Sequence, residues 1–283
     1  MKWDDFRESE NVEDRRGRRV ARGGKLGLGT VVILGALGWY LGIDPQLLLS
    51  GAEMLSSGSS SQEQDYSSGS PVDEQGIFAA KILGNTEDIW QDIFQKQLSK
   101  NYHPPGMVIF SEGTESACGF AQSAIGPFYC PLDRKVYIDL SFFQQMQQQF
   151  GAGGDFAYAY VLAHEVGHHV ENELGILREV QNQQRAAGQA DANRLSVRLE
   201  LMADCLAGVW AHHSNIRYRS LDSGDIEDAL RTAEAIGDDM LQKRSQGYIV
   251  PDSFTHGTSK QRMEWLSVGL KSGQVNSCNT FAP

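Results

Sequence analysis

The feature that most constrains the fold is a set of metal-binding residue types inside an apolar helical stretch. Residues 159–173 read AYVLAHEVGHHVENE, so His164, Glu165 and His168 stand among Val, Leu and Ala. Residues four apart lie one turn apart on the same face of an α-helix, which lets His164 and His168 offer two imidazoles to one metal ion. Buried imidazoles without a partner would be costly. The stretch therefore predicts a helix over 155–173 that carries a metal site.

The glutamate between the histidines has the chemistry of a general base. Glu165 precedes His168 by three residues, close enough to reach a water molecule beside the metal. Two nitrogen ligands, an open position and a carboxylate that accepts a proton are what a zinc hydrolase requires. His169 points away from the pair by the 3.6-residue period, so we do not expect it to be a ligand. The competing interpretation is a helical turn in which the histidines are ordinary polar residues.

A second acidic helix can supply the third protein ligand that catalytic zinc usually takes. Glu200 and Asp204 are four residues apart in RLELMADCLAGVW, residues 198–210. Acids on an apolar helical face need a cation or hydrogen bonds. We predict Glu200 as the third ligand and Asp204 as the acceptor that orients a ligating histidine. The exchanged assignment, with Asp204 as the ligand, and a solvated helix face both stay open here.

These motifs together resemble those of a known family. HEVGHH followed by ELMAD is similar to the HExxH and ExxxD motifs of gluzincin metallopeptidases, especially the HtpX-type group. The chain also resembles the bacterial neutral zinc metallopeptidases of the YpfJ type through GPFYCPLDRKVYIDLSFF, ELMADCLAGVWAHH and SFTHGTSKQR. The resemblance covers essentially the whole chain. It implies a zincin-like peptidase domain with one zinc ion per chain, held by His164, His168 and Glu200, with Glu165 as the general base.

A peptidase also needs a donor that stabilises the oxyanion opposite the metal. The segment FTHGTSKQR offers His256 and Arg262, and HtpX-type peptidases have a similar histidine-to-arginine stretch. We predict His256 as this donor, with a structural histidine in a turn as the alternative. Tyr160 and Tyr137 are weaker candidates, because aromatic residues at such spacings are more often part of a core.

Three functions in different classes are compatible with this site. The leading hypothesis is a zinc-dependent peptidase, expected to be an endopeptidase that acts on protein or peptide substrates, in which Glu165 activates the attacking water. The first alternative is a catalytically silent, metal-stabilised binding or quality-control protein, although such a role has no need of Glu165. The second is a structural zinc site whose fourth position is closed, for instance by Asp204. The same ligand set also binds other divalent metals.

The N-terminal part predicts a membrane anchor. Residues 1–25 hold eight Lys or Arg against six Asp or Glu and precede the uncharged run LGLGTVVILGALGWYLGI, residues 26–43. At about 1.5 Å per residue this run just spans a hydrocarbon core of about 30 Å. The positive-inside rule then predicts a single-pass protein of the bacterial inner (cytoplasmic) membrane, with 1–25 cytoplasmic and the catalytic domain periplasmic or extracytoplasmic. A cleaved signal peptide is the competing interpretation.

The rest of the chain divides into a linker and a domain. Residues 44–75 are rich in Ser, Gly and acids and predict a flexible linker. Residues 76–283 predict the metallopeptidase domain, mainly α with a small β-sheet or hairpin (α+β). MVIF and KVYIDL read as strands, and KVYIDL, residues 135–140, is a candidate edge strand for an extended peptide, although a plain scaffold role is favoured. Helical patterns cover 77–98 with an interruption near Gly84, then 141–150, 176–190, 191–213, 223–244 and 258–270.

Cysteines and charge restrict the environment and the partners. An oxidising compartment makes two disulfides plausible, and we expect Cys118 to pair with Cys130 and Cys205 with Cys278. Connectivity does not follow from the sequence alone, and four buried thiols in a cytosolic protein are the alternative. The formal net charge of −11 argues against nucleic acid as a partner, because phosphate binding needs a basic patch.

Overall fold

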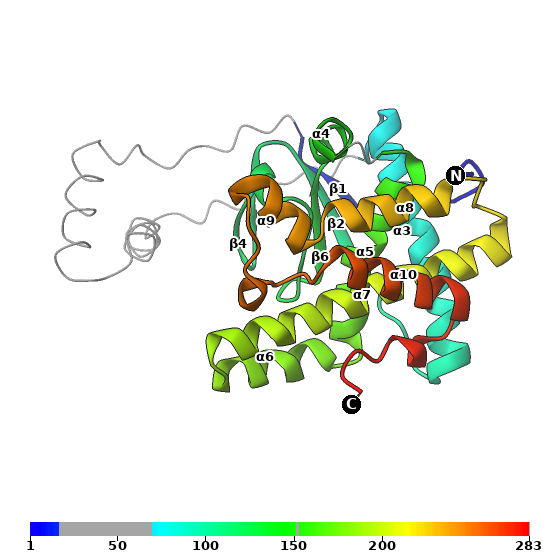
Figure 1. Cartoon of the computed structure of the whole chain (residues 1–283). Helices are drawn as coiled ribbons and strands as arrows, with labels where there is room; N and C mark the ends of the chain where they lie inside the picture. Colours follow the sequence, from blue (N-terminus) through cyan, green and yellow to red (C-terminus); the bar gives the residue numbers. More distant parts are fainter. Residues whose placement is uncertain (17–69, 151–152, 283) are drawn as a thin grey trace, which may run out of the picture. The chain divides into compact units, whose positions relative to one another are not determined.

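Helices packed against a small sheet make up the part of the chain that the computed structural model describes, residues 1–16, 70–150 and 153–282 (Figure 1). The predicted mainly α architecture with a minor β part is confirmed. Residues 26–43, the predicted span, lie outside the described residues, as does most of the predicted linker.

The main sheet has four strands in the order β1-β2-β6-β5, and a separate hairpin pairs β3 with β4. Strands β1, β2 and β6 are parallel, whereas β5 is antiparallel to β6. Because β6 lies between β2 and β5, the prediction that KVYIDL forms an edge strand is wrong; the edges are β1 and β5. The strands are β1 (Val12–Asp14), β2 (Gly106–Phe110), β3 (Gly113–Ser116), β4 (Gly119–Gln122), β5 (Phe128–Cys130) and β6 (Lys135–Asp139).

The helical part follows the predicted order with two differences. The helix expected to be interrupted near Gly84 is continuous. Gly84 instead allows a close approach of the N-terminal segment, since a Cβ there would lie 2.4 Å from the carbonyl oxygen of Arg7. The pattern over 223–244 forms two helices that separate at Gly237. The helices are α3 (Glu74–Ile93) with the π-helix η1 (Phe94–Leu98), η2 (Ser123–Ile125), α4 (Ser141–Phe150), α5 (Asp155–Glu173), α6 (Ile176–Ala186), α7 (Gln189–Tyr218), α8 (Asp225–Ala235), α9 (Asp238–Gln246), η3 (Pro251–Ser253), α10 (Ser259–Ser272) and η4 (Val275–Cys278).

The first sixteen residues belong to the same folded unit as the residues from 70 onward. Strand β1 extends the sheet by pairing with β2, and Phe6 is buried in the core. The side chains of Arg7, Ser9 and Asn11 donate hydrogen bonds to Glu87 on α3 at 2.7, 2.6 and 2.7 Å. This differs from the prediction of a separate basic segment over 1–25 and of a domain that begins at residue 76.

The predicted location in a membrane is corrected by two findings. Within 1–16, 70–150 and 153–282, none of the helices combines the length and the apolar character needed to cross a bilayer. Strand β1 also joins residues before the predicted span to residues after it in one sheet, whereas a single crossing would place them on opposite sides of the membrane. The prediction of a single-pass inner-membrane protein with its N-terminus in the cytoplasm is therefore wrong.

Both predicted disulfides are present. Cys118, in the turn between β3 and β4, is bonded to Cys130 at the end of β5. Cys205 on α7 is bonded to Cys278 in η4, so the C-terminal segment is tied to the helix that carries Glu200. Disulfides of this kind persist in oxidising compartments.

Candidate metal centre

The candidate site lies where α5 and α7 approach each other closely. Gly167 on α5 makes this approach possible, since a Cβ at this position would lie 3.0 Å from both the Cα and the carbonyl oxygen of Ala203 on α7. His164 and His168 flank Gly167 on one helix, and Glu200 and Asp204 flank Ala203 on the other. The close contact therefore sets the two histidines opposite the two acids.

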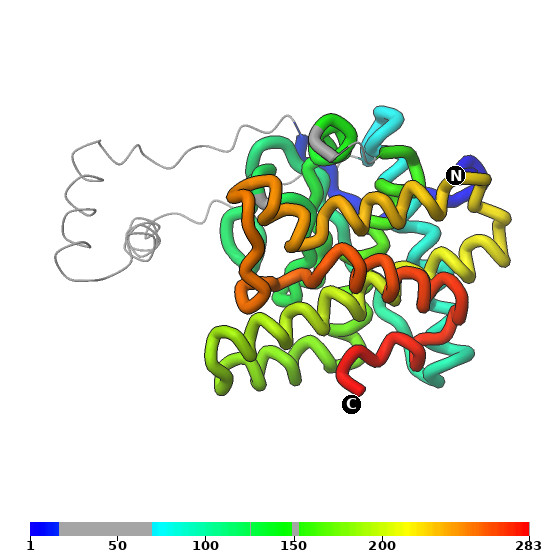
Figure 2. The backbone as a smooth tube through the Cα atoms, viewed as in Figure 1, coloured from blue at the N-terminus to red at the C-terminus, as the bar shows by residue number. Residues whose placement is uncertain are grey.

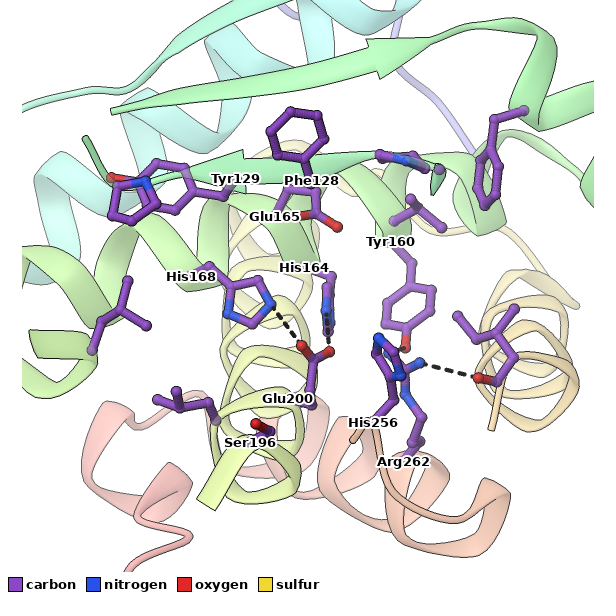
Figure 3. Close-up of a pocket in the computed structure, with 18 of the residues that line it drawn as sticks. Phe128, Tyr129, Tyr160, His164, Glu165, His168, Ser196, Glu200, His256 and Arg262 are labelled. Atoms are coloured by element: carbon purple, nitrogen blue, oxygen red, sulfur yellow. Dashed lines mark hydrogen bonds and ion pairs between the residues drawn. The ribbon is translucent and has the colours of Figure 1, made fainter. Parts of the chain in front are cut away.

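Three side chains from these helices bring ligand atoms together. The Nε2 atom of His164 lies 3.1 Å from one carboxylate oxygen of Glu200, and the Nε2 atom of His168 lies 3.5 Å from the other (Figure 3). One ligand atom from each residue lies within 4.8 Å of the others, so His164, His168 and Glu200 could hold a metal ion. Tetrahedral zinc with bonds of about 2.0–2.1 Å separates its ligand atoms by about 3.3 Å, and the two histidine–glutamate distances are close to this value.

Asp204 lies behind His164 and is not part of this cluster. Its carboxylate, which is completely buried, accepts a hydrogen bond from Nδ1 of His164 at 2.8 Å and from the Tyr160 hydroxyl at 2.6 Å. Two guanidinium nitrogens of Arg262 donate to it at 2.8 and 2.9 Å. With both oxygens engaged in this way, the geometry does not favour the exchanged assignment in which Asp204 is the ligand.

The same contacts explain the shifted pKa values of this pair. Burial disfavours the charged form of each group, but the charge of Asp204 and its hydrogen bond with His164 outweigh this effect and raise the pKa of His164 to about 9. Burial likewise opposes ionisation of Asp204, yet the Arg262 guanidinium lowers the pKa of Asp204 to about 2. Zinc must displace the histidine protons when it binds.

Glu171 is a partner of the site that the sequence analysis did not identify. It lies on α5, is fully buried, and accepts a hydrogen bond from Nδ1 of His168 at 2.9 Å. Both candidate histidine ligands therefore have a carboxylate behind the ring. The signal was present in the sequence, because Glu171 follows His168 by three residues and shares its helix face.

Glu165 lies beside the cluster without belonging to it. Its side chain is buried and lines the same cavity as His164, His168 and Glu200, on the side of Phe128 (Figure 3). Burial raises the pKa of Glu165 above its ordinary value, despite the opposing influence of the two histidines. A raised carboxyl pKa brings a general base closer to neutral pH, where proton transfer is most effective.

His256 reaches the cavity from the loop before α10. Asp238 holds this loop by accepting hydrogen bonds from the backbone N–H groups of Thr255, His256 and Gly257 at 2.7, 2.7 and 3.1 Å. The Nδ1 atom of His256 is 3.2 Å from the Asp238 carboxylate, and this hydrogen bond raises the pKa of His256. His256 is thus placed to present its Nε2 atom as a donor, next to Arg262 (Figure 3).

The other candidates for the oxyanion donor have different surroundings. Arg262 and Tyr160 both line the cavity, but both side chains donate hydrogen bonds to Asp204. Tyr137 donates to Asp133 at 2.7 Å and stacks on Phe128, away from the metal-binding cluster. Among the predicted donors, His256 is the one whose side chain is half exposed at the cavity.

The cavity itself has a volume of about 620 Å³. Apart from the residues already described, its lining side chains are uncharged, and many are apolar. Strand β5, an edge of the sheet, forms one wall, and α6 with the first turns of α7 forms another. The apolar part includes Pro127, Phe128, Phe142, Val161, Leu199 and Leu241.

Comparisons with known proteins show the family of the chain. The sequence family described as "Putative neutral zinc metallopeptidase" matches residues 1–281. The protein named "Uncharacterized protein YpfJ" from Escherichia coli K12 is 48% identical over 293 residues, which cover 99% of each chain. An uncharacterized protein from Mycobacterium tuberculosis H37Rv is 44% identical over 211 residues, 70% of this chain and 68% of its own length. No solved structure matches the chain. On these matches the chain belongs to the neutral zinc metallopeptidase family.

Proposed function

We propose that this protein is a zinc-dependent peptidase that hydrolyses peptide bonds, with one zinc ion held by His164, His168 and Glu200. The observation that carries the proposal is the convergence of these three side chains beside buried Glu165 in an open cavity. The description of the family supports both the metal and the reaction class. The presence of Glu165 argues against a binding protein that does not catalyse a reaction, because such a protein would not need a carboxylate as a general base.

The roles of the residues follow from their positions. When bound, a zinc ion polarises the peptide carbonyl and lowers the pKa of a water molecule beside it. Glu165 accepts the proton of that water and passes it to the leaving amine. Asp204 and Glu171 accept hydrogen bonds from the Nδ1 atoms of the two histidines, which leaves each Nε2 atom available as a ligand.

His256 stabilises the charge that develops on the carbonyl oxygen. Its ring is held by Asp238 through Nδ1, so the opposite nitrogen can donate a hydrogen bond into the cavity. Arg262 acts indirectly. Its guanidinium donates hydrogen bonds to Asp204 and thereby fixes the carboxylate that accepts a hydrogen bond from His164.

The cavity favours an extended polypeptide with uncharged side chains near the scissile bond. Strand β5 is an edge strand whose residues Phe128 and Tyr129 line the cavity, so a substrate chain can lie along it. A charged substrate side chain against the uncharged walls would lose hydration without gaining a partner, which costs several kcal/mol. A substrate bound in this way is cleaved within its chain, as by an endopeptidase.

The test compares the full chain with three variants, using zinc content and cleavage of casein as readouts. Glu165→Gln should retain about one zinc per chain and lose cleavage by at least about 1,000-fold, because the proton acceptor is gone. Glu200→Ala should lose both zinc and cleavage. Glu179→Gln, an exposed substitution on α6, should behave as wild type. Undiminished cleavage by Glu165→Gln, or full zinc content in Glu200→Ala, would contradict the proposal.

A further inference from the structure

The two histidines differ in how the carboxylates behind them are held. Asp204, behind His164, also binds Tyr160 and Arg262, so both of its oxygens have partners. Glu171, behind His168, has a single hydrogen-bond partner in the described part of the chain, the Nδ1 atom of His168. Its second oxygen, Oε1, is buried and has no hydrogen-bond partner among those residues.

A buried carboxylate oxygen without a partner is unfavourable for the fold. Removing a charged group from water without replacing its hydrogen bonds costs free energy, so the unpartnered Oε1 reduces what Glu171 contributes to the stability of the metal-free protein through its ion pair with His168. A carboxylate behind a ligating histidine has a different benefit. It fixes the ring with Nδ1–H toward itself and makes the opposite nitrogen a stronger ligand. In the metal-free protein the ion pair with His168 offsets part of the cost of Glu171, and a cation on the other side of His168 adds the benefit of a stronger ligand.

Glu87 shows what a structural buried glutamate looks like in the same molecule. It lies on α3 and is 4% exposed. Arg7, Ser9 and Asn11 all donate hydrogen bonds to it, and the Arg7 contact is also an ion pair. Glu87 thus ties the N-terminal segment to the domain. Glu171 has no comparable set of partners.

From this contrast we infer that Glu171 is a positioning residue that sets the zinc affinity of the site through His168. The inference rests on the proposed function, because it requires zinc at His164, His168 and Glu200. It assigns to Glu171 no contact with substrate and no contact with the metal.

The experiment measures two quantities on the full chain: the zinc dissociation constant by competition with a chelator, and the urea midpoint of the metal-free protein. Glu171→Gln keeps an oxygen that can accept from His168 but removes the charge, so zinc binding should weaken by about 10-fold. Glu171→Leu removes the acceptor as well, and binding should weaken by up to about 100-fold. The metal-free midpoint of Glu171→Gln should fall by less than that of Glu87→Gln, because Glu171 has one partner, His168, whereas Glu87 has three.

Glu87→Gln is the matched control, and it should show the opposite pattern. Its metal-free midpoint should fall because the ion pair with Arg7 is lost, while its zinc dissociation constant should stay within about twofold of wild type. If Glu171→Gln behaves like Glu87→Gln, with a lower midpoint and unchanged zinc binding, Glu171 is structural and the inference fails. A wild-type protein that binds no zinc would instead overturn the proposed function and this inference together.

Discussion

Each histidine of the motif helix has a distinct environment, although all three lie within the six residues 164–169. His164 and His168 lie against Glu200 on α7, whereas His169 packs against Tyr129 and the backbone of His103. The ring of His169 is completely buried, with Nε2 donating to the carbonyl oxygen of His103 at 2.7 Å and Nδ1 3.0 Å from the Tyr129 hydroxyl. The expectation that His169 is not a ligand agrees with this placement. Its role is in stability.

Burial of His169 predicts a pH dependence of folding. Burial lowers the pKa of His169 from 6.5 to about 4. Between pH 6.5 and about pH 4, His169 is protonated in the unfolded chain but neutral in the folded protein. The free energy of unfolding therefore falls as the pH drops from 6.5 towards 4. The contribution lost by His169 between pH 7 and pH 5 is about 2 kcal/mol. A cation at the neighbouring site would lower this pKa further, so the sign is unchanged.

The measurement is urea unfolding of the metal-free protein at pH 7 and pH 5, for wild type and His169→Gln. Wild type should lose about 2 kcal/mol more than the variant over this interval, because glutamine does not titrate. Equal losses in the two proteins would show that His169 is not a neutral buried group.

Site residues could be predicted from the sequence where their partners lie close in the chain, and not where the partners are distant. His164, His168 and Glu200 could be found because the histidine spacing is local and an acid on an apolar helix signals a buried partner. Glu171 was overlooked, although its spacing was equally local. Asp238 could not be found, since it supports His256 from eighteen residues away through backbone N–H groups, and such contacts leave no trace in residue type.

The packing of helices α5, α7 and α10 carries the geometry of the site. Gly167 lets α5 approach α7, and Gly269 lets α10 approach α7, where a Cβ would lie 1.9 Å from the carbonyl oxygen of Cys205. The tube in Figure 2 shows α10 running along α7. This second contact brings Arg262, on α10, to Asp204. The small residues therefore decide which polar groups meet.

Gly167→Ala should weaken the metal centre by separating α5 from α7. The added Cβ would lie 3.0 Å from two backbone atoms of Ala203, so the helices must shift by a few tenths of an ångström. We expect zinc affinity to fall by roughly 10-fold, since ligand geometry is sensitive to such shifts. The measurement is chelator competition. Gly188→Ala is the control, because nothing lies within 4 Å of its added Cβ, and zinc affinity there should not change.

Helices and strands were predicted well where the local sequence pattern determines them. They were predicted poorly where contacts with residues distant in the chain determine them. The predicted helix over 155–173 coincides with α5. The order of strands was not accessible, because β5 has only three residues and its pairing with β6 follows from a turn rather than from alternation. The break between α8 and α9 at Gly237 arises from the close approach of Ser259, 2.4 Å from where a Cβ would lie, which no local pattern reveals.

On the scale of the whole molecule, the N-terminal segment is an integral part of the folded domain. Residues 1–16 supply an edge strand, a buried aromatic residue and the partners of Glu87. The sequence suggested a separate segment because the strand is short and its partner β2 is about ninety residues away in the chain. Long-range pairing of this kind is invisible to periodicity.

Deletion of residues 1–16 should therefore destabilise the entire domain. It would remove strand β1 and the buried side chain of Phe6, and burying a side chain of this kind contributes about 1.5–3 kcal/mol. Thermal unfolding followed by circular dichroism should show a clearly lower midpoint for the deletion than for the full chain. Glu10→Gln, an exposed substitution in the same segment, should melt as wild type. A deletion variant as stable as the full chain would show that the segment is dispensable.

The most direct test of the whole account is a crystal structure of the zinc-loaded full chain with an anomalous difference map at the zinc edge. We predict a single peak about 2.0–2.2 Å from Nε2 of His164, Nε2 of His168 and the Glu200 carboxylate, with Asp204 outside bonding distance. A peak ligated by Asp204, or a zinc ion held away from the histidine pair, would contradict the central claim.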